Sequence, residues 1–230
     1  MGNIYKRSKG RAFSLRNRSM KLWKEWLSEI DHSESKIKLE KPLIKLANSE
    51  KEYESMIKIS KDKKDYSIEI LDKSSIELWS SVFEKKIIGG LISHEDGRLD
   101  PIKLMKSLMK SLDKIKVKKI DGNVIRISKN TNAFNKKWTI YLENNACINQ
   151  DYIVLCSAFN TPKLLKPLGH EIVVEPILGQ IIELELEYKT MNWNEWPAIL
   201  NYQSINFIHH EPNHIIIGAT IEKGSKPNNI

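Results

Sequence analysis

The chain has no long hydrophobic run and only two cysteines. No apolar stretch in its 230 residues approaches the ~20 residues that a membrane-spanning helix needs. The basic amino terminus, residues 1–19, also lacks the apolar core of a secretory signal peptide. Cys147 and Cys156 suit a reducing compartment, and we expect no disulfide between them because Cys156 ends a predicted buried strand. The sequence therefore predicts a cytoplasmic protein with no membrane segment.

Glycine is sparse, and its spacing excludes a common phosphate site. The ten glycines are residues 2, 10, 89, 90, 97, 122, 169, 179, 218 and 224. No subset gives the G-x-G-x-x-G turn that brings a helix amino terminus against a dinucleotide pyrophosphate. The sequence also contains no P-loop, no H-E-x-x-H zinc motif and no Ser-His-Asp order.

The positive charge is spread along the chain rather than concentrated. The formal net charge is +8, and the densest basic run, KISKDKKD at residues 58–65, contains its own aspartates. A nucleic-acid surface concentrates its charge on one face and interleaves aromatic side chains. Because charge runs usually solvate a surface, we expect no nucleic-acid partner.

Helical periodicity is clearest after residue 99. Asp100 can cap the free amides of a helix, and Pro101 suits the first helical position. The predicted buried stripe of this helix consists of Ile102, Met105, Leu108, Met109 and Leu112. Further helices are predicted at residues 14–30, with Ser14 as the cap, at residues 50–59 and at residues 74–83.

Strand patterns fill much of the remaining chain. In the first two thirds of the chain we expect two short strands at residues 36–48 broken at Pro42, a strand near Val117, a strand at 123–128, a hairpin of 137–142 with 146–148, and a strand at 152–155. In the last third we expect a strand at 181–188 and two strands in 205–223 around a turn at 211–213. Residues 181–188 alternate apolar side chains with glutamates, which is typical of an antiparallel strand with one wet face. Parallel-type βα units beside such a sheet predict two intertwined substructures of the α/β and α+β classes.

The end of the predicted strand at residues 152–155 indicates a ligand site. Three small residues follow it, Cys156, Ser157 and Ala158, and then a short helix with Thr161 as the expected cap. Ligands of α/β proteins gather beyond the carboxyl ends of strands, and small residues let the backbone approach them closely. The alternative is a simple strand-to-helix turn in a core.

Four motifs together resemble the FAD-dependent D-amino-acid oxidase and glycine oxidase superfamily. They are GGLISHEDGRLDP (89–101), DYIVLCSAFNTPKLLKPLG (151–169), VEPILGQIIEL (174–184) and HIIIGATIEKG (214–224). In that family the corresponding stretches look like G-x-x-x-x-x-x-x-G-x-x-D-P, an apolar strand that ends in small residues, P-V-R-G-Q, and I-G-A-T-x-E. The opening S-x-R-x-R-S-x-x-L-W pattern at residues 14–23 agrees with the same register, so the resemblance covers essentially the whole chain.

The resemblance implies a fold and a cofactor. It implies an incomplete FAD-binding Rossmann-like domain, residues 1–34 and 97–168, interleaved with an antiparallel-sheet substrate domain, residues 35–96 and 169–230. The residues that it implies at the FAD site are Val117, Cys156, Ser157, Ala158, Gly179 and Gln180. Relatives usually have glycine at the position of Ala158 and arginine at that of Leu178. The resemblance assigns no catalytic residue.

It also implies that parts of the usual enzyme are missing from this sequence. Family members begin with a strand, the G-x-G-x-x-G turn and a helix, and they continue beyond the I-G-A-T-x-E stretch. We therefore expect a truncated or split chain that a complementing N-terminal polypeptide could complete. The expected reaction is hydride transfer from a small amine or amino-acid substrate to flavin N5. Two alternatives are the FAD domain of a tRNA-modifying oxidase and a non-catalytic remnant or subunit that needs a partner chain.

Several polar and aromatic residues are further candidates for a site. Phe207 falls where amino-acid-oxidising relatives carry a substrate tyrosine, and it has no hydroxyl for a carboxylate. His209 and His210 point to opposite faces of a strand, so they cannot both bind one zinc ion with His214. Residues 94–96, His-Glu-Asp, are interpreted as the polar surface of a loop, with contact to the substrate as the alternative.

Overall fold

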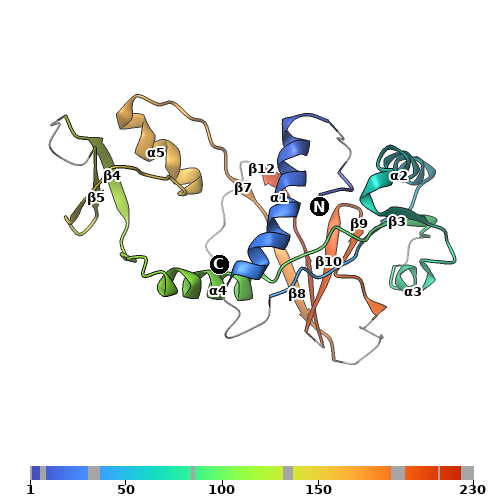
Figure 1. Ribbon diagram of the computed structural model, residues 1–230. Helices are drawn as coiled ribbons and strands as arrows, with labels where there is room; N and C mark the ends of the chain where they lie inside the picture. Colours follow the sequence, from blue (N-terminus) through green and yellow to red (C-terminus); the bar gives the residue numbers. More distant parts are fainter. Residues whose placement is uncertain are drawn as a thin grey trace. The chain divides into compact units, whose positions relative to one another are not determined.

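The computed structural model describes residues 2–5, 9–30, 37–83, 86–131, 137–187, 195–211 and 213–223. The chain forms two compact units (Figure 1). Unit 1 consists of Met1–Val117 and Gln180–Thr220, and unit 2 consists of Lys118–Gly179 and Ile221–Ile230. The predicted assignment of residues 1–34 and 97–168 to one domain and of the rest to another stays a prediction. In the described ranges, no helix is both long enough and apolar enough to cross a membrane.

Unit 1 is built on a seven-stranded mixed sheet with the order β2-β3-β1-β9-β10-β11-β8. Its strands are β1 (Leu43–Ala47), β2 (Ile68–Leu71), β3 (Gly89–Ser93), β8 (Ile181–Glu185), β9 (Ile199–Tyr202), β10 (Ile205–Glu211) and β11 (His214–Gly218). The β1–β9 pair is parallel, with Leu43 opposite Ile199, and the other pairs are antiparallel. Helices and a mixed sheet together confirm the predicted fold class.

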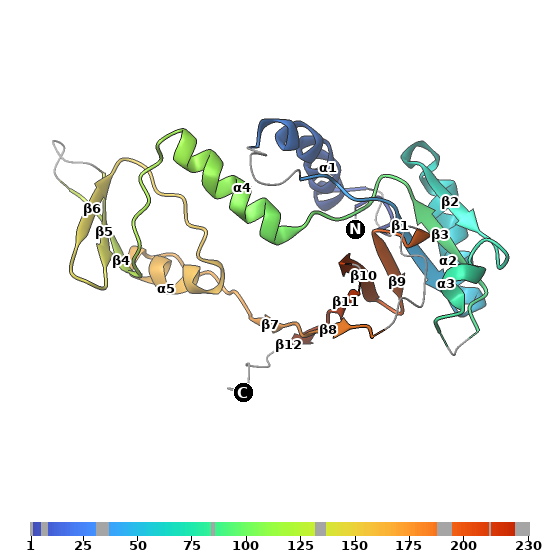
Figure 2. The ribbon, with the colours of Figure 1, turned by 90° about the horizontal axis from the view of Figure 1, so that it is seen from below.

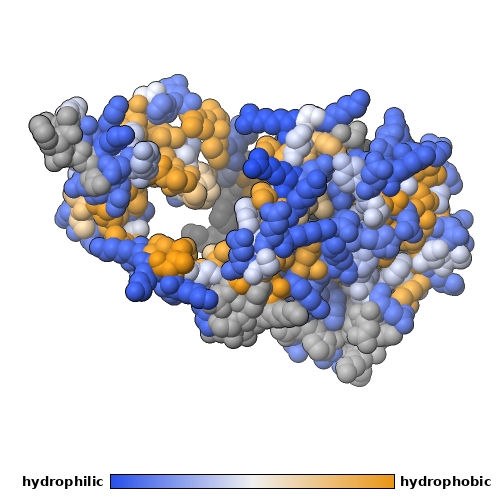
Figure 3. Space-filling view, viewed as in Figure 1, coloured by the Kyte–Doolittle hydropathy of each residue, from blue (hydrophilic) through white to orange (hydrophobic). Residues whose placement is uncertain are grey.

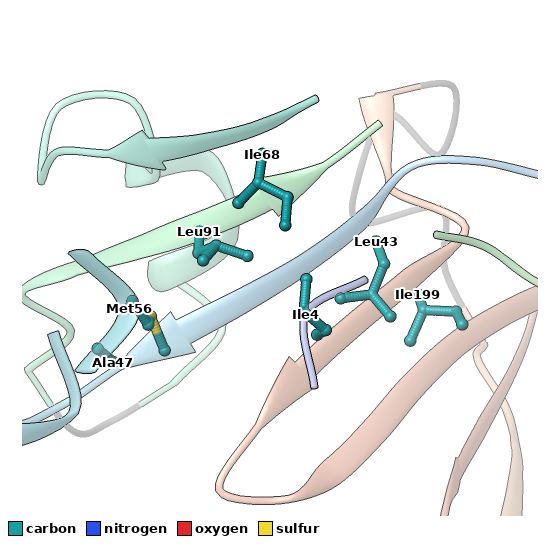
Figure 4. Close-up of a cluster of buried hydrophobic side chains, with 7 residues drawn as sticks. All are labelled: Ile4, Leu43, Ala47, Met56, Ile68, Leu91 and Ile199. Atoms are coloured by element: carbon teal, nitrogen blue, oxygen red, sulfur yellow. The ribbon is translucent and has the colours of Figure 1, made fainter. Parts of the chain in front are cut away.

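The two faces of this sheet carry two cores because side chains alternate along each strand. Leu43 and Ala47 of β1 join a cluster with Met56 of α2 (Glu50–Asp62), and Figure 4 shows its members around β1. Ile44 and Leu46 face the other way, into a cluster that receives Trp79 of α3 (Glu77–Ser80). Strand β1 is therefore buried on both faces.

The predicted helix starts are partly confirmed. Ser49 caps α2, and Asp100 caps α4 (Pro101–Lys114) by accepting hydrogen bonds from the amides of Ile102 and Lys103, both at 3.0 Å. Helix α1 (Arg11–Glu29) begins before the predicted cap: Ser14 lies inside it, and the Ser14 hydroxyl donates to the Gly10 carbonyl. The Ser14 prediction was wrong because the chain is already helical at Arg11.

The predicted buried stripe of α4 was wrong in three of its five members. Ile102, Met105 and Met109 are 60%, 57% and 40% exposed. The side of α4 that faces the protein instead carries buried Ser107 with half-buried side chains, among them Leu104 and Leu108. Periodicity identifies an apolar side, but tertiary contacts decide which part of that side is covered.

Several predicted strands in unit 1 differ from the observed ones. Residues 37–39 form no strand, and Glu40 makes only an isolated bridge with Arg98. Strand β8 is the expected antiparallel strand, but it lies at the sheet edge with its apolar side chains exposed, and Tyr188 lies outside the described residues. Strands β10 and β11 confirm the predicted pair, whose turn residue Pro212 is also outside the described residues. Strands β2, β3 and β9 were not predicted.

Unit 2 contains a three-stranded antiparallel sheet, β4 (Val124–Lys129), β5 (Trp138–Leu142) and β6 (Cys147–Gln150) (Figure 2). The β5–β6 pair confirms the predicted hairpin. The short helix α5 (Thr161–Leu165) lies between the 3₁₀ turns η2 (Ala158–Asn160) and η3 (Lys166–Leu168), and β7 (Ile177–Leu178) pairs with β12 (Glu222–Lys223). A third 3₁₀ turn, η1 (Lys64–Tyr66), belongs to unit 1.

The predicted buried strand at residues 152–155 is not a strand in the structure. Residues 152–155 belong to no helix or strand, and the side chains of Tyr152 and Val154 are 82% and 85% exposed. Cys156 is exposed as well, so its predicted burial was wrong; both cysteines are free thiols. Figure 3 shows apolar residues at the surface of the part of the molecule that contains β4, β5 and α5. An apolar sequence predicts a strand, but a strand also needs a neighbour that pairs with it.

Candidate functional site

The small residues after the predicted strand form an accessible turn in unit 2. Ser157 is half-buried, and its hydroxyl lies 3.0 Å from that of Thr161. Thr161 is the first residue of α5 rather than its cap, and the Asn160 side chain makes no capping hydrogen bond. Ala158 has a φ of 47°, in the left-handed region that glycine adopts without strain. The backbone at Ala158 thus has a conformation that glycine adopts more readily than alanine.

The other predicted cofactor residues are those at which the chain passes from one unit to the other in sequence. Val117 is 43% exposed, and its amide donates to the Leu112 carbonyl just after α4, so the strand predicted there is absent. Gly179 is an exposed residue of unit 2. Gln180 belongs to unit 1, where its amide donates to the Thr220 hydroxyl at 3.0 Å and its carbonyl accepts from the Thr220 amide at 3.1 Å. A shared cofactor role for the six residues stays a prediction.

Unit 1 contains a pocket of about 740 Å³ that the sequence did not reveal. It lies between α1, residues 2–3, the loop at 95–99 and the beginning of α4. Part of its lining is apolar or aromatic, namely Met20, Trp23, Leu39, Tyr66, Leu99, Pro101 and Leu104. Charged side chains of both signs line it as well, namely Arg16, Lys21, Lys24, Asp65, Glu95, Asp96 and Arg98. A concave site of this volume that combines apolar walls with converging polar groups is typical of small-molecule sites.

Ion pairs fix the charged groups around this pocket. The Glu95 carboxylate lies 2.6 Å from Lys24 Nζ and 3.1 Å from Lys41 Nζ. The hydrogen bond from Lys24, followed by that from Lys41, lowers the pKa of Glu95, which is therefore ionised at neutral pH. Arg98 pairs with Glu40 at 2.6 Å and also donates to the His209 carbonyl at 2.9 Å.

The wall formed by residues 2–5 is held from two sides by buried charges. The Asp96 carboxylate accepts hydrogen bonds from the amides of Gly2, Asn3 and Ile4, and Lys63 Nζ donates to the carbonyls of Asn3 and Tyr5. Burial lowers the pKa of Lys63, against the opposing attraction of Asp96. Asp96 was interpreted from the sequence as loop surface, and no local signal could have corrected this because its partners lie more than 90 residues away.

The aromatic and histidine candidates do not line this pocket. The Phe207 ring packs against Phe83 at 5.2 Å and joins the core cluster that contains Tyr202. His214 Nδ1 lies 3.4 Å from Glu183. In the part of the chain that the structure describes, no three His, Cys, Asp or Glu side chains are grouped so that they could hold a metal ion.

Solved structures of flavoenzymes share this fold. Glycine oxidase from Geobacillus kaustophilus aligns with a TM-score of 0.79 at 17% identity, over 97% of this chain and 60% of that one. L-Proline dehydrogenase from P. horikoshii aligns with a TM-score of 0.73 at 14% identity, over 100% and 61%. The FAD-bound L-α-glycerophosphate oxidase from Mycoplasma pneumoniae gives 0.72 at 14%, over 97% and 60%. The chain thus spans about 60% of the length of these proteins.

The comparison with family models agrees with the structural likeness. No curated protein matches the sequence. The model of the FAD dependent oxidoreductase family, DAO, matches residues 1–229, which is nearly the whole chain. The chain therefore belongs to the DAO family of FAD-dependent oxidoreductases.

Proposed function

We propose that this chain is the central part of a flavoenzyme that oxidises a small amine or amino acid, and that it acts with a polypeptide segment carrying the pyrophosphate-binding turn. The family match over residues 1–229 carries the proposal. FAD, when bound, supplies the acceptor for the hydride that leaves the substrate C–H bond. The chain's own residues hold the cofactor, bind the substrate and orient the two.

The turn at Cys156, Ser157 and Ala158 fits a role in holding FAD. Its side chains are small, Cys156 and Ala158 are exposed, and the left-handed Ala158 turns the backbone where relatives have glycine. A backbone without bulky side chains can approach a nucleotide closely. These features support adenosine contacts from unit 2.

The pocket of unit 1 suits the small substrate. An amino acid carries an ammonium and a carboxylate, and the pocket has charged groups of both signs beside apolar walls. Glu95 is ionised and Arg98 is a permanent cation, so a zwitterion bound here would compete with Lys24 and Lys41 for Glu95 and with Glu40 for Arg98. Trp23 and Tyr66 offer apolar surface to the rest of the molecule.

A complementing polypeptide is supported by the surface of unit 2. The sequence contains no G-x-G-x-x-G turn, and the apolar segment at residues 152–155 exposes Tyr152 and Val154. An added strand would pair with such a segment and cover its side chains, as in β-augmentation. A chain left without this strand should associate non-specifically through its unpaired edge.

Flavin absorbance tests the proposal. The chain alone should bind FAD weakly or not at all, because each charge-assisted bond to the pyrophosphate is worth ~1.5–3 kcal/mol. Adding a polypeptide with a strand, a G-x-G-x-x-G turn and a helix should give stoichiometric yellow protein on gel filtration. Stoichiometric FAD on the isolated chain would contradict the need for the partner. Absence of FAD binding in the mixture would contradict the cofactor role.

Substitutions at Ala158 test the place of the cofactor in that mixture. Ala158→Gly should keep FAD binding or strengthen it, because glycine adopts a φ of 47° without strain. Ala158→Val should weaken it, because a β-branched side chain is disfavoured there and obstructs the approach. Ala146→Val, at an exposed position of the same unit, is the control. Equal FAD affinity for both valine variants would place the cofactor elsewhere.

A further inference from the structure

The backbone of residues 2–5 lies between two buried charges of opposite sign. Asp96 is only 2% exposed, and its oxygens accept from the amides of three consecutive residues: Gly2, Asn3 at 3.0 and 3.1 Å, and Ile4 at 3.1 Å. Successive amides that converge on one anion form a backbone nest. Here the anion is a side chain of the protein itself.

Lys63 holds the same segment through its carbonyls. It is the C-cap residue that follows α2, is also 2% exposed, and donates from Nζ to the carbonyls of Asn3 and Tyr5. Lysine and aspartate are almost never buried so fully unless they are paired. In this case the pair acts across a stretch of backbone, so amides and carbonyls are satisfied together.

This arrangement fixes the position of the segment. Ile4 is 6% exposed in the core cluster, and Figure 4 shows it beside Leu43 and Ile199. Gly2 lies so close to α1 that a Cβ atom there would be 1.9 Å from Met20 Sδ. Gly2 and Asn3 are also part of the pocket lining. One wall of the pocket is therefore a backbone segment whose position depends on two charged side chains.

We propose that Asp96 and Lys63 are a pair of positioning residues that hold residues 2–5 in place, so that Gly2 and Asn3 form a fixed wall of the pocket and set the shape of the ligand that fits. The part that concerns the ligand rests on the proposed function, in which this pocket holds the small substrate. Apolar replacements would fill the same volume, but they would leave the amides of residues 2–4 without an acceptor. The two charged side chains are thus needed to hold the wall in its position, whereas apolar side chains could fill the same volume of the core.

Amide exchange measured by NMR on the full chain tests the pair without any ligand. Asp96→Asn should accelerate exchange at Asn3 and Ile4 by roughly 10- to 100-fold, the effect of losing a hydrogen bond to a charged group. Exchange in β1 should change much less, because its hydrogen bonds lie within the sheet. Glu95→Gln is the matched control: it removes the neighbouring carboxylate, which pairs with Lys24 and Lys41 and not with the segment. This control should leave Asn3 and Ile4 unchanged.

A second variant keeps the test decisive if Asp96→Asn does not fold. Lys63→Gln should accelerate exchange at the same two amides, because the Asn3 and Tyr5 carbonyls lose the hydrogen bonds that Lys63 Nζ donates. Unchanged exchange at Asn3 and Ile4 would overturn the proposal. A uniform acceleration throughout unit 1 would also overturn it, because that result marks a general loss of stability.

Glycine titration by calorimetry, in the FAD-bound mixture, then tests the ligand. Lys63→Gln, at a residue outside the pocket lining, should weaken glycine binding at least ~10-fold if the wall shapes the substrate pocket. Equal glycine affinity in the variant and the wild type would overturn the role in ligand selection. Absence of glycine binding in the wild type would count against glycine as the substrate of the proposed function, and the exchange result would still decide whether the pair holds the wall.

Discussion

Replacing Gly97 with alanine should destabilise unit 1 through a contact that only the backbone geometry reveals. A Cβ atom on Gly97 would lie 1.9 Å from the Glu40 carbonyl oxygen, and real Cβ atoms essentially never approach within 3.0 Å. The two backbones must therefore separate by about 1.1 Å. Glu40 and Arg98 exchange two backbone hydrogen bonds of 2.9 Å across this contact, and such a separation breaks both.

The expected loss follows from these two bonds. Each contributes a net ~0.5–1.5 kcal/mol, so the free energy of unfolding should fall by ~1–3 kcal/mol. The side-chain pair of Arg98 and Glu40, at 2.6 Å, should weaken as well. Gly122→Ala is the control, because its nearest neighbour would be Leu142 Cδ1 at 3.4 Å, an ordinary contact. That change should stay within ~0.5 kcal/mol.

Urea unfolding followed by circular dichroism gives the stability of both variants. Amide exchange assigns the loss to its unit: Gly97→Ala should accelerate exchange at Glu40 and Arg98 first, while unit 2 is unaffected. The measurement is made on the chain alone or on its complex with the complementing polypeptide, whichever unfolds in a single transition. A Gly97→Ala protein as stable as the Gly122→Ala control would refute the reasoning, because the backbones would then separate at no cost.

Two further predictions concern hydrogen-bonded carboxylates. Asp100→Ala should cost ~0.5–2 kcal/mol in urea unfolding, because the amides of Ile102 and Lys103 lose their acceptor; Lys106→Ala, on an exposed side of α4, should cost less than ~0.5 kcal/mol. Hydrogen bonds from the Ser75 hydroxyl and amide and from Ser74 lower the pKa of Asp72 from 3.8 to about 2. Its contribution to stability is therefore present above pH 3.8 and lost as the pH falls through about 2, so an Asp72→Asn protein should approach the wild type in melting temperature over that range. A constant difference between them at every pH would contradict this assignment.

Local sequence signals were enough to predict an element wherever residues close in the sequence supply its stabilising contacts. The Asp100-Pro101 start of α4 and the β5–β6 hairpin were predicted from neighbouring residues, and both are observed. The four motifs in register likewise led to the family that the comparisons show. The start of α4 and the hairpin depend on helix capping, turn residues and short-range strand pairing, which a few consecutive residues determine.

The remaining features required partners that are distant in the sequence. Asp96 is a buried acceptor because residues 2–4 present their amides to it, and a loop sequence carries no sign of that. Ile102 has the same periodicity as a core residue but is exposed, because no described element packs over it.

The segment at residues 152–155 shows the same division between sequence and structure. It has the composition of a buried strand, but backbone hydrogen bonds form only where a neighbouring strand is in place. The sequence by itself determined the family and the starts of α2 and α4. Tertiary structure alone decided which apolar surfaces are covered and which charges are buried, because both depend on contacts between segments whose separation in the chain leaves no local pattern.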